Sequence, residues 1–298
     1  MRIPNNNFSG TLVSQLQTLT ARQSALHSQI ATGQRITNPS DDPAAIARVL
    51  RLQGEKSEIQ QFSRNNDRAL NVSQSSFSAI EQLKHVSDRA GELAVLGNGT
   101  TSPDAFRAYE AETDQMLEQA LQTANTKYAG EHLFGGTKSD VAPFAATRDV
   151  AGRITAITYN GAATGAEIRI SEGAKLSPFT TGAENQKLSD FMNNLVSLRD
   201  GLKSGSSAAV QATRPALETS ENDFLVTMSG IGAKQSRLEA DRSQNEARFV
   251  ELENLTAAET DVDIASTVVK LTQAQTAYQA AMESGSKILQ LSLLDYIR

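Results

Sequence analysis

The sequence contains no cysteine, no tryptophan and few aromatic residues of any kind. Without cysteine, neither a disulfide framework nor a thiolate metal site can form. Aromatic residues make up 5% of the chain, although 39% of it is hydrophobic. Large globular cores usually bury more aromatic area, so this balance favours elongated helices that pack through small and aliphatic side chains.

Long apolar segments are also missing. No stretch approaches the roughly 18 apolar residues that a membrane span needs, so membrane insertion is not expected. The first residues, MRIPNNNFSGTLVSQLQ, have neither the apolar core of a cleaved signal peptide nor a twin-arginine motif. The chain is therefore expected to be cytosolic, or to leave the cell by a route that needs no cleaved signal.

Charge and motifs give no sign of catalysis or nucleic-acid binding. The formal net charge is −6 and the basic residues are dispersed, which argues mildly against a nucleic-acid partner. The three histidines are widely separated, and no zinc-protease, nucleotide-binding or serine-hydrolase motif occurs. Two acidic pairs, Asp41–Asp42 and Asp261/Asp263, lack the ligand run of a calcium loop and fit helix starts better. No catalytic residue, cofactor or metal ligand is predicted.

The strongest positive pattern lies at the two ends of the chain. Mostly apolar residues recur there at alternating spacings of four and three, which places them on one narrow stripe of an α-helix. This pattern is typical of a coiled-coil seam, and each stripe contains one glutamine. The N-terminal stripe is Leu12, Leu16, Leu19, Gln23, Leu26 and Ile30, and the C-terminal stripe is Ile264, Val268, Leu271, Gln275, Tyr278, Met282, Gly285 and Leu289.

The matched stripes predict that the two terminal helices pair in antiparallel fashion, with the middle of the chain looped out between them. If the ends are level, residue i lies near residue 298 − i, so Gln23 is predicted to face Gln275. A buried polar pair of this kind can fix register at some cost in stability. Because an isolated pair of helices buries little area, its apolar faces are predicted to bind further copies of the chain.

Between the ends, the pattern predicts long helices and one β-rich segment. Pro215 is predicted in the first turn of its helix, and Asn160–Gly161 is predicted as the turn between two strands. Further strands near 134 and 141–147 would complete a small sheet. The predicted helices are about 9–32, 44–96, 103–130, 187–203, 214–255 and 261 onward, and the paired strands are 154–159 and 167–170.

These elements predict a mainly α fold: a long antiparallel helical rod or coiled coil with paired terminal helices and a small β-rich insert at its tip. A strict seven-residue repeat from Val210 to Leu252 favours supercoiling against a partner helix. Three parts are predicted. They are a terminal coiled-coil domain (1–43 plus 257–298), a helical rod domain (44–132 plus 186–256) and the insert (133–185).

The segment between the first two predicted helices has two interpretations. Asp42 is suited to be the N-cap of the second helix and Pro43 to open its first turn, while the bond before Pro39 favours an extended backbone. One interpretation is a simple joint between helices, and the other is an ordered contact loop. Its residues are Asn38, Pro39, Ser40, Asp41, Asp42 and Pro43.

Three segments of this chain resemble one known family. They are QIATGQRITNPSDDPAAIARVL (29–50), ANTKYAGEHLFGGT (124–137) and YQAAMESGSKILQLSLLDYIR (278–298). They resemble the family of flagellar hook-associated protein 3, in the bacterial flagellin-like superfamily, and the resemblance covers essentially the whole helical frame. GAKQSRLEADR (232–242) resembles flagellin as well, but flagellin normally shows an N-S-A-x-D-D type of loop where this chain has NPSDDP.

The resemblance implies a secreted, non-enzymatic structural subunit of the extracellular flagellum, at the junction between the hook and the filament. Its implied partners are copies of itself in a ring, the first hook-associated protein, flagellin, and the type III export apparatus with a chaperone. Terminal helices form the inner tube in such families. The two terminal stripes, apart from Gly285, and the residues Asn38 to Pro43 are therefore the expected assembly interface.

Other functions stay open at this stage. The closest alternative is flagellin itself, which polymerises without limit. A second is a secreted enzyme or binding module carried by the β-rich insert. A third is a type III translocator that engages a membrane, which should show a strongly apolar helix.

Overall fold

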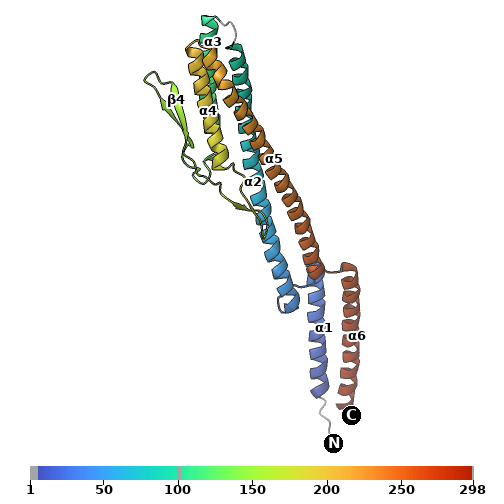
Figure 1. Cartoon of the computed structure of the whole chain (residues 1–298). Helices are drawn as coiled ribbons and strands as arrows, with labels where there is room; N and C mark the ends of the chain where they lie inside the picture. The colour runs from blue at the N-terminus through green and yellow to red at the C-terminus, as the bar shows by residue number, and fades with distance from the viewer. Residues whose placement is uncertain (1–5, 99–101, 297–298) are drawn as a thin grey trace. The chain divides into compact units, whose positions relative to one another are not determined.

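The computed structural model describes residues 6–98 and 102–296, and the side chains of 10–98 and 102–287. Over these residues the chain forms six helices and six short strands, which confirms the predicted mainly α fold with a small β insert. Figure 1 shows the helices, which are α1 (Asn6–Thr32), α2 (Pro43–Leu96), α3 (Pro103–Ala124), α4 (Gly182–Lys203), α5 (Ser207–Thr260) and α6 (Ile264–Tyr296).

The chain divides into two compact units. The terminal unit comprises Met1–Glu58 and Phe249–Arg298, and it holds α1, α6, the start of α2 and the end of α5. The central unit comprises Ile59–Arg248 and holds the remaining elements. The predicted division into terminal, rod and insert domains stays a prediction.

Several helix ends lie where the sequence places their caps. The Ser102 side chain accepts a hydrogen bond from the Ala105 N–H, and Pro103 opens α3. The Asp42 carboxylate accepts a hydrogen bond of 3.0 Å from the Ala45 N–H at the start of α2. After α1, Gly33 has a φ of 70°, the left-handed conformation that glycine adopts most easily.

Two predicted helix boundaries are wrong. Helix α5 begins at Ser207, so Pro215 lies inside the helix and not in its first turn. The Ser206 hydroxyl accepts a hydrogen bond from the Ala209 N–H, which provides the earlier cap. Helix α3 ends at Ala124, because the next residues form a tight hairpin in which Ala129 and Gly130 both have positive φ.

The strands form three separate two-stranded antiparallel sheets, and the predicted pairing of 154–159 with 167–170 is wrong. The Asp149 carboxylate accepts hydrogen bonds from the Ala151 and Arg153 N–H groups, and this turn joins β3 to β4. The hairpin therefore turns at Asp149, whose carboxylate binds two backbone N–H groups, and not at Asn160–Gly161. The pairs are β1 (Lys127–Tyr128) with β2 (Glu131–His132), β3 (Phe144–Arg148) with β4 (Ile154–Tyr159), and β5 (Ile168–Arg169) with β6 (Lys175–Leu176).

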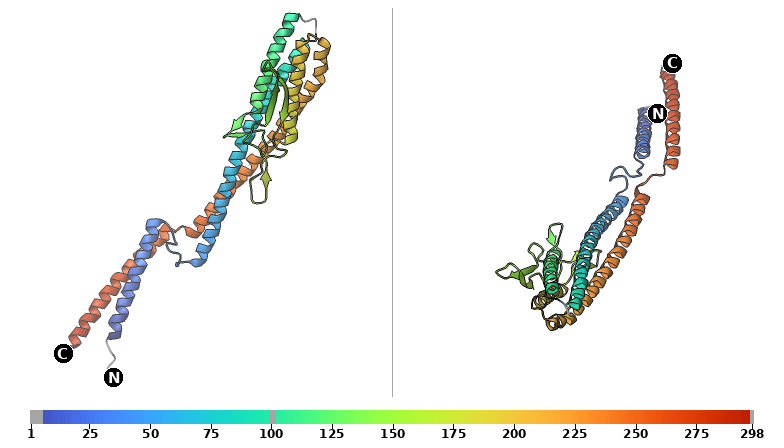
Figure 2. Two further views of the ribbon diagram at one scale, coloured as in Figure 1. Left: turned by 90° about the vertical axis from the view of Figure 1, so that its left-hand side faces the viewer. Right: turned by 90° about the horizontal axis from the view of Figure 1, so that it is seen from above.

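The main hydrophobic core lies in the central unit, where α2, α3, α4 and α5 pack together. Phe191 of α4 and Phe224 of α5 meet edge to face with ring centroids 5.0 Å apart. The β3–β4 hairpin lies against the helices (Figure 2), and the Asn193 side chain bonds both the N–H and the C=O of Ile157. Since these bonds satisfy part of the outer edge of β4, they fix the hairpin to α4.

Candidate assembly surface of the terminal unit

Helices α1 and α6 run side by side in antiparallel fashion (Figures 1 and 2). The predicted N-terminal stripe lies along α1, with Leu26 buried at 8% exposure. A single partner helix covers this stripe only in part. Its other members are half-buried, and they are Leu12, Leu16, Leu19, Gln23 and Ile30.

Gln23, the glutamine of the N-terminal stripe, contacts α6 one residue away from the residue that was predicted to face it. The Gln23 side-chain amide donates a hydrogen bond of 3.1 Å to the Ala274 carbonyl oxygen. The Gln275 side chain is exposed, so the predicted pair of buried glutamines is wrong. A backbone acceptor on α6 satisfies the Gln23 amide in its place.

The residues of α6 that face α1 form a second stripe, offset from the predicted one. Leu271, Tyr278 and Gly285 belong to both stripes. The remaining inner positions are small residues, which allow α1 to approach closely. The inner stripe, with spacings of four and three, is Thr267, Leu271, Ala274, Tyr278, Ala281 and Gly285.

At Gly285 the two helices approach one another closely. A Cβ atom built on Gly285 would lie 2.4 Å from Cδ2 of Leu12. Real Cβ contacts are not this short, so any larger residue would have to displace the Leu12 side chain. Gly285 therefore permits close packing between α1 and α6.

The other predicted residues of α6 face solvent. Ile264, Val268 and Met282 are 53%, 44% and 49% exposed, and Gln275 is exposed between them. Their spacings of four, seven and seven keep them on one face, which we call the outer stripe of α6. The Leu289 side chain lies outside the described residues. An apolar row of this kind along one helix is a candidate contact surface.

The two linkers that lead into the terminal helices are joined to one another. The Arg35 N–H donates a hydrogen bond of 2.7 Å to the Thr260 carbonyl, and the Val262 N–H donates one of 3.0 Å to the Gly33 carbonyl. Gln34 and Asp261 thereby form an antiparallel bridge. We call this region, together with the ion pairs around it, the joint.

Two arginines and two carboxylates reinforce the joint. Arg48 of α2 binds Glu259 of α5 with two parallel hydrogen bonds of 2.8 and 2.9 Å. This bidentate contact is the main reason that the pKa of Glu259 lies below its usual range. Arg35 donates to the Asp42 carboxylate at 3.3 Å and to the Glu259 carbonyl oxygen at 2.9 Å.

The loop from Asn38 to Pro43 is ordered by its two aspartates. The Asp41 carboxylate accepts hydrogen bonds from the Asn38 N–H at 2.8 Å and from the Thr37 N–H and hydroxyl at 3.2 Å. The Asn38 N–H contributes most to lowering the pKa of Asp41. The Ala45 N–H does the same for the pKa of Asp42. Side chains that do not order the loop project into solvent, and they are Asn38, Pro39, Ser40 and Pro43.

Sequence reasoning missed the charged residues of the joint and half of the inner stripe. Arg48 and Glu259 are 211 residues apart, and isolated charges carry no signal for such a pairing. The inner stripe did leave a signal, since Thr267, Ala274 and Ala281 repeat every seven residues. Small residues at heptad spacing predict a packed face of a helix, as larger apolar residues do.

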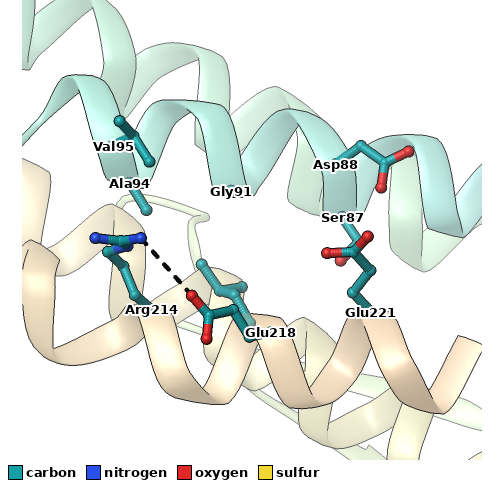
Figure 3. Close-up of a pocket in the computed structure, with 9 residues that line it drawn as sticks. Ser87, Asp88, Gly91, Ala94, Val95, Arg214, Glu218 and Glu221 are labelled. Carbon is teal, nitrogen blue, oxygen red and sulfur yellow. Dashed lines mark ion pairs between the residues drawn. The ribbon is translucent and has the colours of Figure 1, made fainter.

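The central unit has a groove between α2 and α5 that shows no catalytic arrangement. Carboxylates of Asp88 and Glu221 come from opposite helices (Figure 3). Arg214 pairs with Glu218 of its own helix at 3.7 Å, while Asp88 binds Lys84 at 2.8 Å. Within the described part of the chain, no cluster of three or more histidines and acidic residues could hold a metal ion. Nor is any helix there long and apolar enough to cross a membrane.

The comparisons with known proteins agree with the resemblance carried by the three segments. Residues 3–139 match the family model described as the bacterial flagellin N-terminal helical region. Flagellar hook-associated protein 3 of Salmonella typhimurium is 26% identical over 311 aligned residues, covering 98% of this chain and 96% of that protein. The chain is thus similar to flagellar hook-associated protein 3 along nearly its whole length, and its N-terminal part is similar to flagellin.

Flagellins and solved structures are also similar to the chain. The flagellin of Bacillus subtilis is 24% identical over 295 aligned residues, covering 94% of each chain. The crystal structure of Bacillus cereus FlgL, at 20% identity, has a TM-score of 0.60 and covers 70% of this chain and 99% of that one. The flagellar junction protein FlgL from Legionella pneumophila, at 14% identity, has a TM-score of 0.53 with coverage of 73% and 100%. These structures share the fold of this chain.

Proposed function

We propose that this chain is a structural subunit of the bacterial flagellum, at the junction between the hook and the flagellin filament. The observation that carries the proposal is the match to a flagellar hook-associated protein 3 over 98% of the chain. The terminal unit supports it, because each terminal helix has one partner helix and leaves apolar side chains available for others.

In this proposal the terminal unit joins neighbouring subunits. The outer stripe of α6 packs against helices of adjacent copies, and the half-buried stripe of α1 completes the contact. The exposed part of the Asn38–Pro43 loop touches a neighbouring subunit, while Asp41 and Asp42 hold its shape. Burial of Ile264, Val268 and Met282 removes apolar area from water, which stabilises the assembly in proportion to that area.

The proposed partners follow from this position. Copies of the chain form a ring that contacts the first hook-associated protein on one side and flagellin on the other. The subunit is exported in an unfolded state by the flagellar type III apparatus with a chaperone, and it acts outside the cell.

Flagellin is the weaker alternative. It also matches along the chain, at 24% identity. Two observations favour the junction protein: the slightly higher identity with equal or greater coverage, and a loop that reads NPSDDP. A flagellin would build the filament, so the two functions differ in what their loss leaves on the cell.

Deletion of the gene tests the proposal. The bacteria would be examined by electron microscopy, and the medium would be blotted for flagellin. Bare hooks together with flagellin released into the medium are expected. Bare hooks with a medium free of flagellin would identify this chain as the filament subunit, and intact filaments would contradict both functions. Complementation with the intact gene is the control.

A further inference from the structure

Buried polar residues interrupt the core face of α2 in the central unit. Asn66 is 1% exposed, although its neighbours on that face, such as Ala69, are apolar. Neither the nitrogen nor the oxygen of the Asn66 side-chain amide has a hydrogen-bond partner among the described protein groups. A buried amide without partners destabilises a fold, so Asn66 requires an explanation.

A second unpaired polar atom lies at the same level on α5. Oδ2 of Asp241 is also buried without a hydrogen-bond partner. The Asp241 side chain is 24% exposed and forms an ion pair of 3.9 Å with Arg237 of the same helix, a distance beyond hydrogen-bond range. Its Oδ2 atom is thus a buried acceptor without a hydrogen-bond donor.

The register of the two helices places Asn66 opposite Asp241. Ala69 of α2 and Leu238 of α5 pack in one small apolar cluster. The adjacent residues Asp67 and Arg242 form an ion pair of 3.6 Å across the helices. In an antiparallel pair of helices, the residue one turn before Ala69 lies level with the residue one turn after Leu238. These two residues are Asn66 and Asp241.

The β5–β6 hairpin is hydrogen-bonded to both helices close to this level. The Asn245 side-chain amide donates a hydrogen bond of 3.3 Å to the Ile170 carbonyl, and the Asn65 amide donates one of 2.7 Å to the Arg169 carbonyl. Ile170 itself is fully buried. The hairpin therefore covers a polar layer whose donors and acceptors come from both helices.

We propose that this layer is a binding site for internal water. One water molecule accepts a hydrogen bond from Nδ2 of Asn66 and donates one to Oδ2 of Asp241, and a second donates to Oδ1 of Asn66. Buried waters in proteins typically make about three hydrogen bonds to polar groups that otherwise lack partners. The bridge couples α2 to α5 and fixes their register beneath the hairpin. The site is independent of the proposed flagellar function.

A double-mutant cycle tests the coupling. Asn66→Leu, Asp241→Leu and the double variant would be compared in the full-length chain by guanidinium unfolding, followed by circular dichroism. If water bridges the two side chains, Asn66→Leu removes the group that holds the water on the buried Oδ2 atom of Asp241. The unfolding equilibrium constant is then expected to rise at least tenfold, and the double variant is expected to recover most of that loss.

The matched control combines Asn66→Leu with Thr227→Ala, a buried position about four helical turns away on α5. This pair is expected to be additive within twofold. If Asn66→Leu stabilises the chain to the same degree with and without Asp241, the two groups are not coupled and the proposal is wrong.

A crystal structure of the wild-type chain distinguishes water from direct contact, and it also serves if a variant does not fold. Density for a water within about 3.2 Å of both the Asn66 amide and the Asp241 carboxylate is expected. A direct hydrogen bond between the two side chains, or a dry layer, would overturn the proposal.

Discussion

At the scale of single residues, glycine and small side chains decide how closely the terminal helices approach. Gly285 lies against Leu12, whereas Gly54 on α2 has open space where a Cβ would be. Both are helical, so alanine at either position removes the same intrinsic cost of glycine in a helix. Only the tertiary contact distinguishes them.

We predict different outcomes for alanine at these two glycines. Gly54→Ala is expected to stabilise the chain by about 0.5–1 kcal/mol, the usual helix-propensity gain. Gly285→Ala is expected to lose part or all of that gain, because its Cβ must displace the end of the Leu12 side chain. The urea midpoint for loss of helical circular dichroism would be measured for both. Equal stabilisation by the two variants would show that the contact with Leu12 does not constrain the pair.

Two adjacent valines provide a test of the outer stripe. Val268 lies on the stripe with Ile264 and Met282, while Val269, at 57% exposure, points about 100° away around α6. We predict that Val268→Glu reduces motility of a complemented deletion strain strongly, since burying an unpaired carboxylate opposes assembly. Val269→Glu is the matched control and is expected to keep most motility. Equal motility in the two strains would mean that the stripe is not buried in the assembly.

At the scale of elements, the joint combines backbone bonds with exposed ion pairs. Glu259, Asp41 and Asp42 all have pKa values below their usual range, mainly through hydrogen bonds from Arg48, the Asn38 N–H and the Ala45 N–H respectively. A carboxylate whose pKa is lower in the folded state stabilises that state above its unfolded pKa. The stabilisation is lost as the pH falls through the folded pKa.

We therefore predict that the joint weakens on acidification, beginning near the ordinary pKa values of 4.5 for glutamate and 3.8 for aspartate and continuing below them. Hydrogen exchange of the Arg35 and Val262 amides, followed from pH 5.5 to pH 3 and corrected for intrinsic rates, would measure the opening. Glu259→Gln is expected to reduce the pH dependence of this exchange in part. The double variant Glu259→Gln, Arg48→Met is expected to differ little from Glu259→Gln alone. A profile that is unchanged in Glu259→Gln would refute the role of this ion pair.

At the scale of the whole chain, the two units differ in how much core each one holds. The central unit contains the large hydrophobic cluster, whereas Leu26 is the buried residue of the α1 stripe. Removal of either terminal helix should therefore abolish assembly without unfolding the central unit.

We predict that a chain reduced to 43–260 stays soluble and helical and does not restore motility to the deletion strain. Circular dichroism with thermal unfolding would measure the first property, and swimming assays the second. A truncated chain that unfolds would show that the terminal helices are part of the folding core, and one that restores motility would contradict their role in assembly.

Elements with local signals could be predicted from the sequence alone. The period of the apolar residues predicted α1 and its stripe, and the caps at Ser102–Pro103 and Asp42–Pro43 placed helix starts correctly. These features depend on hydrogen bonds and side chains within a few residues of one another. The resemblance of three segments added the similarity to flagellar hook-associated protein 3, which the comparisons also find.

Which face of α6 meets α1, and which strands pair, depends on long-range packing. The predicted and observed stripes of α6 share Leu271, Tyr278 and Gly285, so the sequence period is the same for both. The choice depends on α1, more than 200 residues away, which packs against Leu271, Tyr278 and the small residues between them and leaves Ile264, Val268 and Met282 in solvent. The hydrogen bond from Gln23 to Ala274 spans 251 residues, and no local pattern encodes a contact of that separation.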